Sequence, residues 1–173
     1  SIAVEAADIQ DPTNELVAVI SSPYSYYRKP VADAIKNSRN GGTLDLLAHG
    51  VVRFSSLDIR YATVFERPRG GPVHKDGHGG MSENLILEKV LPPIAACLLD
   101  LHQGAMTHRA IRADNLFYSD SERQTIVLGE AISQAPGLLQ PTVYEPLESM
   151  MAHPPGRGDG VPAHDLYAVG ILF

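Results

Sequence analysis

The stretch that most constrains the fold of this chain is the polar loop at 107–118, which lies between a helix pattern and two strand patterns. Upstream of it, apolar residues recur at helical spacing and stop before Gly104; they are Ile94, Cys97, Leu98 and Leu101. Downstream, the runs 116–118 and 125–128 are strand-like and flank a polar turn. The sequence therefore predicts a core helix that leads directly into a polar loop, followed by a hairpin.

The first third of the chain predicts strands around one helix. Apolar and β-branched runs separated by turn residues predict four strands, at 1–6, 15–21, 51–54 and 60–65. Lys29-Pro30 starts the helix, because proline fits an early helical position where its missing N–H is not needed. Asn40-Gly41-Gly42 ends it.

Two adjacent prolines are expected to divide the helical middle part of the chain. Ser82 caps a short helix that runs through Lys89. Pro92 and Pro93 end this helix, because proline removes a hydrogen bond and clashes with the preceding turn. A new helix is predicted to start at Ile94.

Composition argues against several classes of function. The 173 residues carry a formal net charge of -6, whereas nucleic-acid-binding proteins usually have a basic surface, so no nucleic-acid partner is expected. The one cysteine, Cys97, is expected to be a small buried hydrophobe. Its lack of a disulfide partner fits a reducing compartment and predicts a cytoplasmic protein. The sequence contains no run of about 18 apolar residues, the length needed to cross a membrane, so no membrane segment is expected in this chain. Whether flanking regions carry such a segment is left open.

A glycine-rich loop at 70–80 contains two histidines at a spacing that helical metal sites use. His74 and His78 would share one face of a helix and could bind one metal ion there. Gly77 lies between them, and no cysteine or glutamate is close in the sequence. A solvated loop is therefore predicted.

Six motifs, in the same order, resemble those of protein kinases. Residues 108–115 resemble the catalytic loop His-Arg-Asp-Leu-Lys-x-x-Asn. The other five resemble the strand that carries the lysine, the hinge between the lobes, the strand before Asp-Phe-Gly, the Ala-Pro-Glu motif and the start of the central large-lobe helix; they lie at 17–20, 65–71, 127–132, 144–148 and 164–170. Each motif alone is weak, but six in order make a strong resemblance over nearly the whole chain.

The resemblance implies an α+β, protein kinase-like bilobal fold with a small β-rich N-lobe and a mainly helical C-lobe. We expect the N-lobe over 1–66, a hinge and glycine-rich linker over 67–80, and part of the C-lobe over 81–173. The family's glycine-rich phosphate loop and its later C-lobe helices have no counterpart in the sequence. The domain is therefore expected to be truncated at both ends.

The resemblance also places unreactive residues at the reacting positions. Ala110 occupies the position of the catalytic aspartate, which accepts the proton of the substrate hydroxyl. Ile20 occupies the position of the strand lysine, and the helix that follows has no glutamate to hold such a lysine. Lys29 and Lys36 are the candidate substitutes. Asp114 is expected to be a surface carboxylate rather than a replacement base.

Four residues are candidates for nucleotide binding. Asn115 and Glu130 fall at the metal-binding positions of the family, and their oxygens are of the kind that Mg²⁺ prefers. With Phe65 as gatekeeper, Glu66 supplies a hinge carbonyl. Pro68 stands at the hinge donor position but has no N–H, which is expected to weaken adenine binding by roughly 1 kcal/mol.

The remaining matches are structural. His108, Arg109 and Asp165 correspond to residues that organise the catalytic loop in the family, with Asp165 anchoring the loop from the central helix. Ala131-Ile132 replaces Phe-Gly, and a β-branched residue resists a positive φ. This segment is therefore expected to keep one fixed conformation.

These expectations together predict a pseudokinase, which is a catalytically inactive kinase-like domain that acts as a protein-binding scaffold or regulator in signalling. A protein partner is expected, with no cofactor or with weakly bound ATP and Mg²⁺. Two alternatives stay open, and both would use Asn115 and Glu130. One is an atypical kinase-fold enzyme that binds nucleotide in another orientation, and the other is a nucleotide sensor that does not react.

Overall fold

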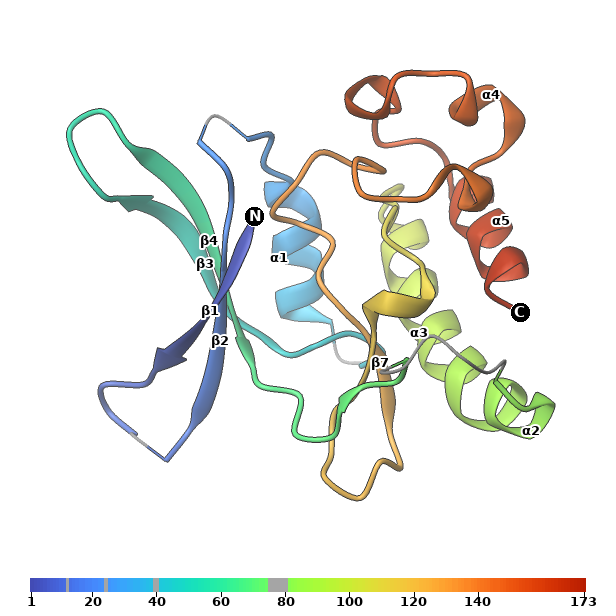
Figure 1. The fold of residues 1–173 in the computed structure, drawn as a ribbon, viewed down its shortest axis with the longest axis horizontal. Helices are drawn as coiled ribbons and strands as arrows, with labels where there is room; N and C mark the ends of the chain where they lie inside the picture. Colours follow the sequence, from blue (N-terminus) through green and yellow to red (C-terminus); the bar gives the residue numbers. More distant parts are fainter. Residues whose placement is uncertain (12, 24, 39–40, 75–80) are drawn as a thin grey trace.

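The computed structural model describes residues 1–11, 13–23, 25–38, 41–74 and 81–173. Figure 1 shows a β-rich N-terminal part on one side and a mainly helical C-terminal part on the other. The predicted α+β class is confirmed. Whether the domain boundaries lie at 66/67 and 80/81 stays a prediction, and His78 of the predicted glycine-rich loop lies outside the described residues.

The N-terminal part contains one antiparallel sheet with the strand order β1-β2-β4-β3. The strands span Ile2–Ala7 (β1), Glu15–Ile20 (β2), Leu46–Arg53 (β3) and Ile59–Glu66 (β4). All four were predicted, but β3 begins five residues before the predicted position at 51. The missed residues include Ala48, His49 and Gly50, which are weak strand formers that the pairing with β4 holds in the sheet.

Helix α1, Lys29–Asn37, lies between the sheet and the C-terminal part (Figure 1). Pro30 is in its first turn, as predicted. Its buried face consists of Val31, Ala32 and Ile35, which join the core cluster. The helix thereby connects the small lobe to the rest of the molecule.

The helical middle part is not divided by the two prolines, contrary to the prediction. Helix α2, Glu83–Leu85, continues through a π-helical stretch, η1 at Ile86–Val90, into helix α3 at Leu91–Gln103. Pro92 and Pro93 fall in the first turn of α3, and the N–H of Leu91 bonds to the carbonyl of Ile86. The wider π-turn takes up the hydrogen-bonding change, so the prolines do not end the helix.

A second, three-stranded sheet contains the hairpin that follows the polar loop at 107–115. Its order is β5-β6-β7, with β5 at Gly71–Pro72, β6 at Leu116–Tyr118 and β7 at Ile126–Leu128. The short helix η2, Ala113–Asn115, precedes β6. Leu128 exchanges backbone hydrogen bonds with Gly42 and Leu44, which ties this sheet to the N-terminal part. A side chain at Gly42 would meet the carbonyl of Pro93, so glycine is required for this approach.

The last third consists of short elements packed on one helix. They are η3 at Thr142–Tyr144, α4 at Leu147–Met150, η4 at Pro154–Gly156 and α5 at Pro162–Leu172. The core runs from α1 through α3 to β6, β7 and α5, and Ile94, Leu101 and Leu128 are among its most buried side chains. No helix in the described ranges is long and apolar enough to cross a membrane.

Candidate functional site

A cavity of about 970 Å³ lies between the two parts of the molecule. Val17 and Val19 of β2 and Phe65 of β4 line it from the small lobe, and Phe117 of β6 lines it from the large lobe. The segment 67–72 lines the side where the chain passes from one lobe to the other. The cleft is therefore open and has apolar walls suited to a flat ring.

The loop below this cavity is anchored by a buried carboxylate. Asp165 of α5 accepts hydrogen bonds from the backbone N–H of His108 (2.7 Å) and of Arg109 (2.8 Å). His102 Nε2 lies 3.1 Å from the same carboxylate. Arg109 adopts a φ of 61°, a left-handed conformation that a non-glycine residue holds only when its surroundings impose it. Asp165 supplies part of that constraint.

Arg109 is further held by a buried ion pair that the sequence did not reveal. Its Nη1 lies 3.0 Å from Glu145 Oε2, and both side chains are almost fully buried. Arg157 approaches the other carboxylate oxygen at 3.9 Å. These distances describe charge contacts rather than aligned hydrogen bonds, because neither carboxylate oxygen of Glu145 meets the hydrogen-bond geometry. Glu145 lies in the segment 144–148 that resembles the Ala-Pro-Glu motif, but nothing in its spacing along the sequence indicates a contact with Arg109.

The residue at the catalytic-aspartate position is a buried alanine. Ala110 donates its N–H to His108 Nδ1 (3.3 Å) and accepts from the Asn115 amide (2.9 Å). Because Nδ1 of His108 is an acceptor here, its ring proton is on Nε2. Burial lowers the pKa of His108 to about 4, although Asp165 acts in the opposite direction. The hydrogen bonds around Ala110 itself therefore come from neutral groups, and the loop has no side-chain base at this position.

Asn115 and Glu130, the two predicted metal ligands, lie next to each other but bind the protein itself. The Asn115 amide donates to the carbonyls of Ala110 (2.9 Å) and Glu130 (3.1 Å). The Glu130 carboxylate accepts the N–H of Ile132 (2.6 Å), the N–H of Ser133, and the hydroxyl of Ser133 (2.8 Å). Both carboxylate oxygens are thus used to close the turn at 131–133.

The donor set does not fit a divalent metal. Within the described ranges, no group of three or more His, Cys, Asp or Glu side chains is arranged to hold a metal ion. The three hydrogen bonds that Glu130 accepts take up most of the roughly four lone-pair positions of its carboxylate, and Asn115 Oδ1 packs against Gly129, where an added Cβ would clash with it. The segment uses the carboxylate as a structural acceptor, while the single fixed conformation expected from Ala131-Ile132 stays a prediction.

Strand β2 presents Val19 to the cleft, one residue before the position that the motif comparison indicated. Val17 and Val19 line the cavity, whereas Ile20 is not among the described lining residues. Side chains alternate between the faces of a strand, so Ile20 points to the opposite face. Lys29 pairs with Asp33 on the exposed side of α1, and Lys36 is exposed on the same helix. Neither lysine is among the residues that line the cavity.

The backbone N–H groups of the hinge at 66–71 are bonded to carbonyls of the protein itself. The N–H groups of Glu66 and Arg67 bond to the carbonyls of Asp45 and Glu15. Those of Arg69, Gly70 and Gly71 bond to Ser119, Tyr118 and Pro68, while Pro68 itself has no N–H. No free backbone donor is therefore left along 66–71 to bind the edge of a base.

The charged lining of the cavity is mainly basic. Four arginines line it, Arg67, Arg69, Arg112 and Arg123, against two glutamates, Glu15 and Glu130. Arg112 pairs with Asp114 through Nε at 2.7 Å, and Asp114 is exposed, as predicted. Its two terminal nitrogens form no hydrogen bond or ion pair with the described part of the chain. The sequence analysis did not single out these arginines, because they come from three separate segments.

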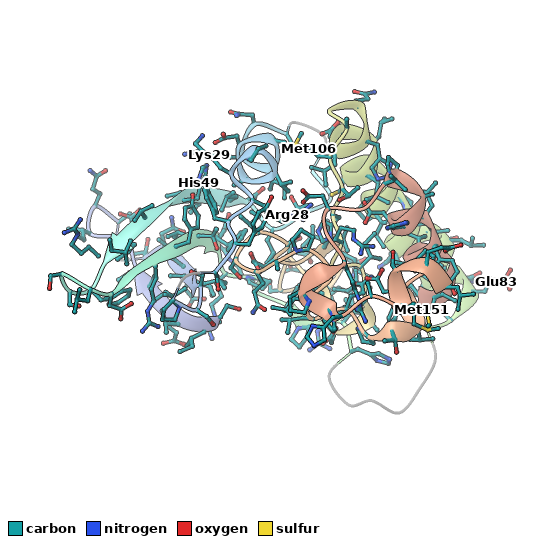
Figure 2. The ribbon with its side chains drawn as sticks, turned by 90° about the horizontal axis from the view of Figure 1, so that it is seen from above. Arg28, Lys29, His49, Glu83, Met106 and Met151 are labelled. Carbon is teal, nitrogen blue, oxygen red and sulfur yellow. The ribbon has the colours of Figure 1, made fainter. Side chains whose placement is uncertain are left out.

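Arg28 is a second residue that the sequence did not reveal. It lies just before α1 and is 2% exposed. Its Nη1 donates to the carbonyls of His108 (2.8 Å) and Ala131 (3.1 Å), and its Nη2 donates to the carbonyl of Thr107 (2.6 Å). Figure 2 shows Arg28 where the small lobe meets the C-terminal part. The side chain fixes α1 to the loop at 107–111 and to the segment that contains Ala131.

Cys97 is buried in α3, and burial raises the pKa of its thiol to about 12. The thiol is therefore protonated near neutral pH and is not a nucleophile. This agrees with the expected role as a small hydrophobe.

Solved structures with the same fold are protein kinases and pseudokinases. The chain superposes on the Cydia pomonella granulovirus kinase PK-1 with a TM-score of 0.64 at 18% identity, covering 91% of this chain and 57% of that one. Its match to Rad53 1-466 in complex with AMP-PNP has a TM-score of 0.68 at 15% identity, and it covers 97% of this chain and 42% of that one. The match to the Neurospora crassa PAN3 pseudokinase mutant has a TM-score of 0.54 at 15% identity, and it covers 73% of this chain and 33% of that one.

These likenesses show a protein kinase-like fold, as predicted. The chain spans between one third and three fifths of the length of these three structures. No family model matches the sequence, and no curated protein is similar to it.

Proposed function

We propose that this chain is a kinase-fold binding module that does not transfer phosphate, and that it acts as a pseudokinase scaffold or regulator for a protein partner. The observation that carries the proposal is the state of Glu130. Its carboxylate is closed into the turn at 131–133 by three hydrogen bonds. Phosphoryl transfer depends on neutralising charge around the γ-phosphate, and a sequestered carboxylate cannot hold the metal that does so.

Two further positions support the loss of transfer. Ala110 offers a methyl group where a proton acceptor is needed, and Val19 gives the strand an apolar side chain in the cleft. The only carboxylates among the described lining residues are Glu15 and Glu130, and no lysine lines the cavity there. The loss is therefore spread over three elements, and no single residue accounts for it.

The test is incubation with γ-labelled and α-labelled ATP, in Mg²⁺ and in Mn²⁺, with a generic protein substrate and with the chain alone. We expect no label transfer above that of a buffer control. Transfer that disappears in Glu130→Ala would overturn the proposal, because it would assign the activity to this cleft rather than to a contaminating kinase.

A second function, nucleotide sensing without reaction, is favoured by the open cavity and its four arginines. A filled cleft would have argued against any ligand, whereas this one combines apolar walls with cationic side chains. Thermal-shift titration with ATP tests it. A rise in the unfolding temperature is expected, and no shift at millimolar ATP would exclude a sensor role.

A further inference from the structure

The cleft departs from a metal-nucleotide site in two independent ways. The metal position is occupied by protein contacts, since Glu130 caps its own turn and Asn115 Oδ1 lies against Gly129, close to where a Cβ on that residue would be. The hinge position offers no backbone donor, since each N–H along 66–71 is either bonded within the protein or missing at Pro68. A ligand bound here therefore gains little from a divalent ion and gains no hydrogen bond from a backbone donor of the hinge.

What the cleft does offer is cationic charge. Among the described residues that line the cavity, four arginines and two glutamates give an excess of two positive charges. The protein as a whole has a net charge of -6. The fields of such a cleft attract anions against the overall charge of the protein. Glu130 faces its own loop, which further reduces the negative charge that a ligand would meet.

The arginines differ in how strongly the protein already uses them. Arg67 pairs with Glu5, and Arg69 lies 3.6 Å from Glu66. The side chains of both pairs are between 43% and 80% exposed, so these pairs exchange easily for a ligand. Arg123 contacts the Tyr118 ring at 5.7 Å.

Arg112 is the best placed of the four. It lies beside Asn115 on the large-lobe side, with its Nε fixed by Asp114 and its two terminal nitrogens free of the described residues. A guanidinium with two free nitrogens matches two oxygens of one phosphate group.

The apolar walls complete the site without reading a base. Val17 and Val19 lie on one side and Phe117 on the other, so an aromatic ring can be enclosed by contacts that every base provides. The free backbone donor that a discriminating hydrogen bond would need is absent from the hinge at 66–71.

We infer that this cleft binds nucleoside triphosphates as free anions, without a divalent metal and with little discrimination between purine bases. The inference rests on the nucleotide-sensing function proposed above and specifies its ligand. The phosphates are held by Arg112 with help from Arg123, and the base lies between the β2 valines and Phe117. Mg²⁺ neutralises part of the triphosphate charge, so it weakens binding here where a metal-dependent site requires it.

Isothermal titration calorimetry of the whole chain with ATP and with GTP, each in EDTA and in excess Mg²⁺, tests this. We expect ATP and GTP to differ by less than about threefold in Kd, because no hinge N–H is free to make the hydrogen bond, worth roughly two- to tenfold, that would favour one base. We expect both ligands to bind more tightly in EDTA than in Mg²⁺. Binding that needs Mg²⁺, or binding of ATP without GTP, would overturn the inference.

Two variants separate the site from general electrostatics. Arg112→Gln is expected to raise the Kd of ATP in EDTA by about tenfold or more, as for a lost charge-assisted hydrogen bond. Arg53→Gln removes the same charge from the exposed end of β3, away from the cavity, and is expected to leave the Kd unchanged. Arg123→Gln is a second site variant if Arg112→Gln unfolds. Equal Kd values for the wild type and both site variants would show that ATP binds elsewhere.

The outcomes also distinguish this inference from the proposals above it. If neither ATP nor GTP binds at millimolar concentration, both the inference and the sensor function fail, while the non-catalytic module stands. If γ-phosphate is transferred in a way that depends on Glu130, the non-catalytic module itself fails.

Discussion

The loop at 107–115 and the cleft above it differ in the side chains that they use. The loop is held by buried charges, with Asp165 on the backbone of His108 and Arg109, Glu145 beside Arg109, and Arg28 reaching across from the small lobe. The cleft has Val17 and Val19 in its small-lobe wall and no lysine among its described lining residues, and Ala110 gives the loop no side-chain base. The loop is therefore held in place by contacts that are separate from the residues that line the cleft.

The largest effect is expected from the buried carboxylate that faces two arginines. Glu145→Gln leaves Arg109 and Arg157 buried without a counter-charge, and such a loss costs about 4 kcal/mol. The free energy of unfolding, from urea titration, measures it. Glu148→Gln is the matched control, because Glu148 is exposed on α4, and its value should stay near that of the wild type. A small loss in Glu145→Gln would mean that the loop is held mainly by Asp165.

The next effect tests the connection between the lobes. Arg28→Ala removes three hydrogen bonds to the carbonyls of Thr107, His108 and Ala131, and leaves these carbonyls buried. We expect a loss of about 3 kcal/mol in the free energy of unfolding. Hydrogen exchange should also rise together in α1 and in the loop at 107–111, because Arg28 joins the two. Faster exchange in α1 alone would show that the loop does not depend on the small lobe.

Acid is expected to destabilise the loop through His108. Burial holds its folded-state pKa at about 4, below the unfolded value near 6.5. The neutral form is therefore favoured by folding, and this contribution is complete above the unfolded pKa and is lost as the pH falls toward 4. Between pH 7 and pH 5 the loss amounts to about 2 kcal/mol.

Urea titrations at several pH values measure this slope. His108→Gln serves as the comparison, because it removes the titrating group and keeps a polar side chain. The difference between the two slopes isolates His108 from the other six histidines of the chain. Parallel slopes would show that the ring takes up its proton over the same pH range in the folded and the unfolded protein, so that burial does not lower its pKa.

The sequence could predict what depends on neighbours in the chain. Lys29-Pro30 begins α1 and the motif order predicted the bilobal fold, because helix starts and turn residues are local signals. The same local reasoning failed at Pro92-Pro93, where a π-helical turn upstream lets the helix continue. A proline rule describes the ideal helix and gives no information about a preceding turn that has already changed its hydrogen bonds.

The candidate site was harder to predict, because it depends on contacts between distant segments. Motif matching counted along β2 and reached Ile20, whereas the face of the strand is set by its pairing with β4, and Val19 lines the cavity. Glu130 was identified as a carboxylate, but the direction of its side chain is set by the N–H groups of the following turn. Arg28 binds a loop about 80 residues away, and no spacing rule connects the two.

The smallest expected effect concerns the alanine in the loop. Ala110→Asp restores a carboxylate where the family has its base, within the same anchored backbone. We expect no γ-phosphate transfer above the wild-type background, in Mg²⁺ or Mn²⁺, because Val19 still gives the cleft an apolar side chain and Glu130 still binds its own turn. Ala110→Asn is the control of equal size without charge. Transfer by Ala110→Asp but not by Ala110→Asn would show that one residue separates this cleft from an active one, and that the hydrogen bonds of Glu130 open when a metal nucleotide arrives.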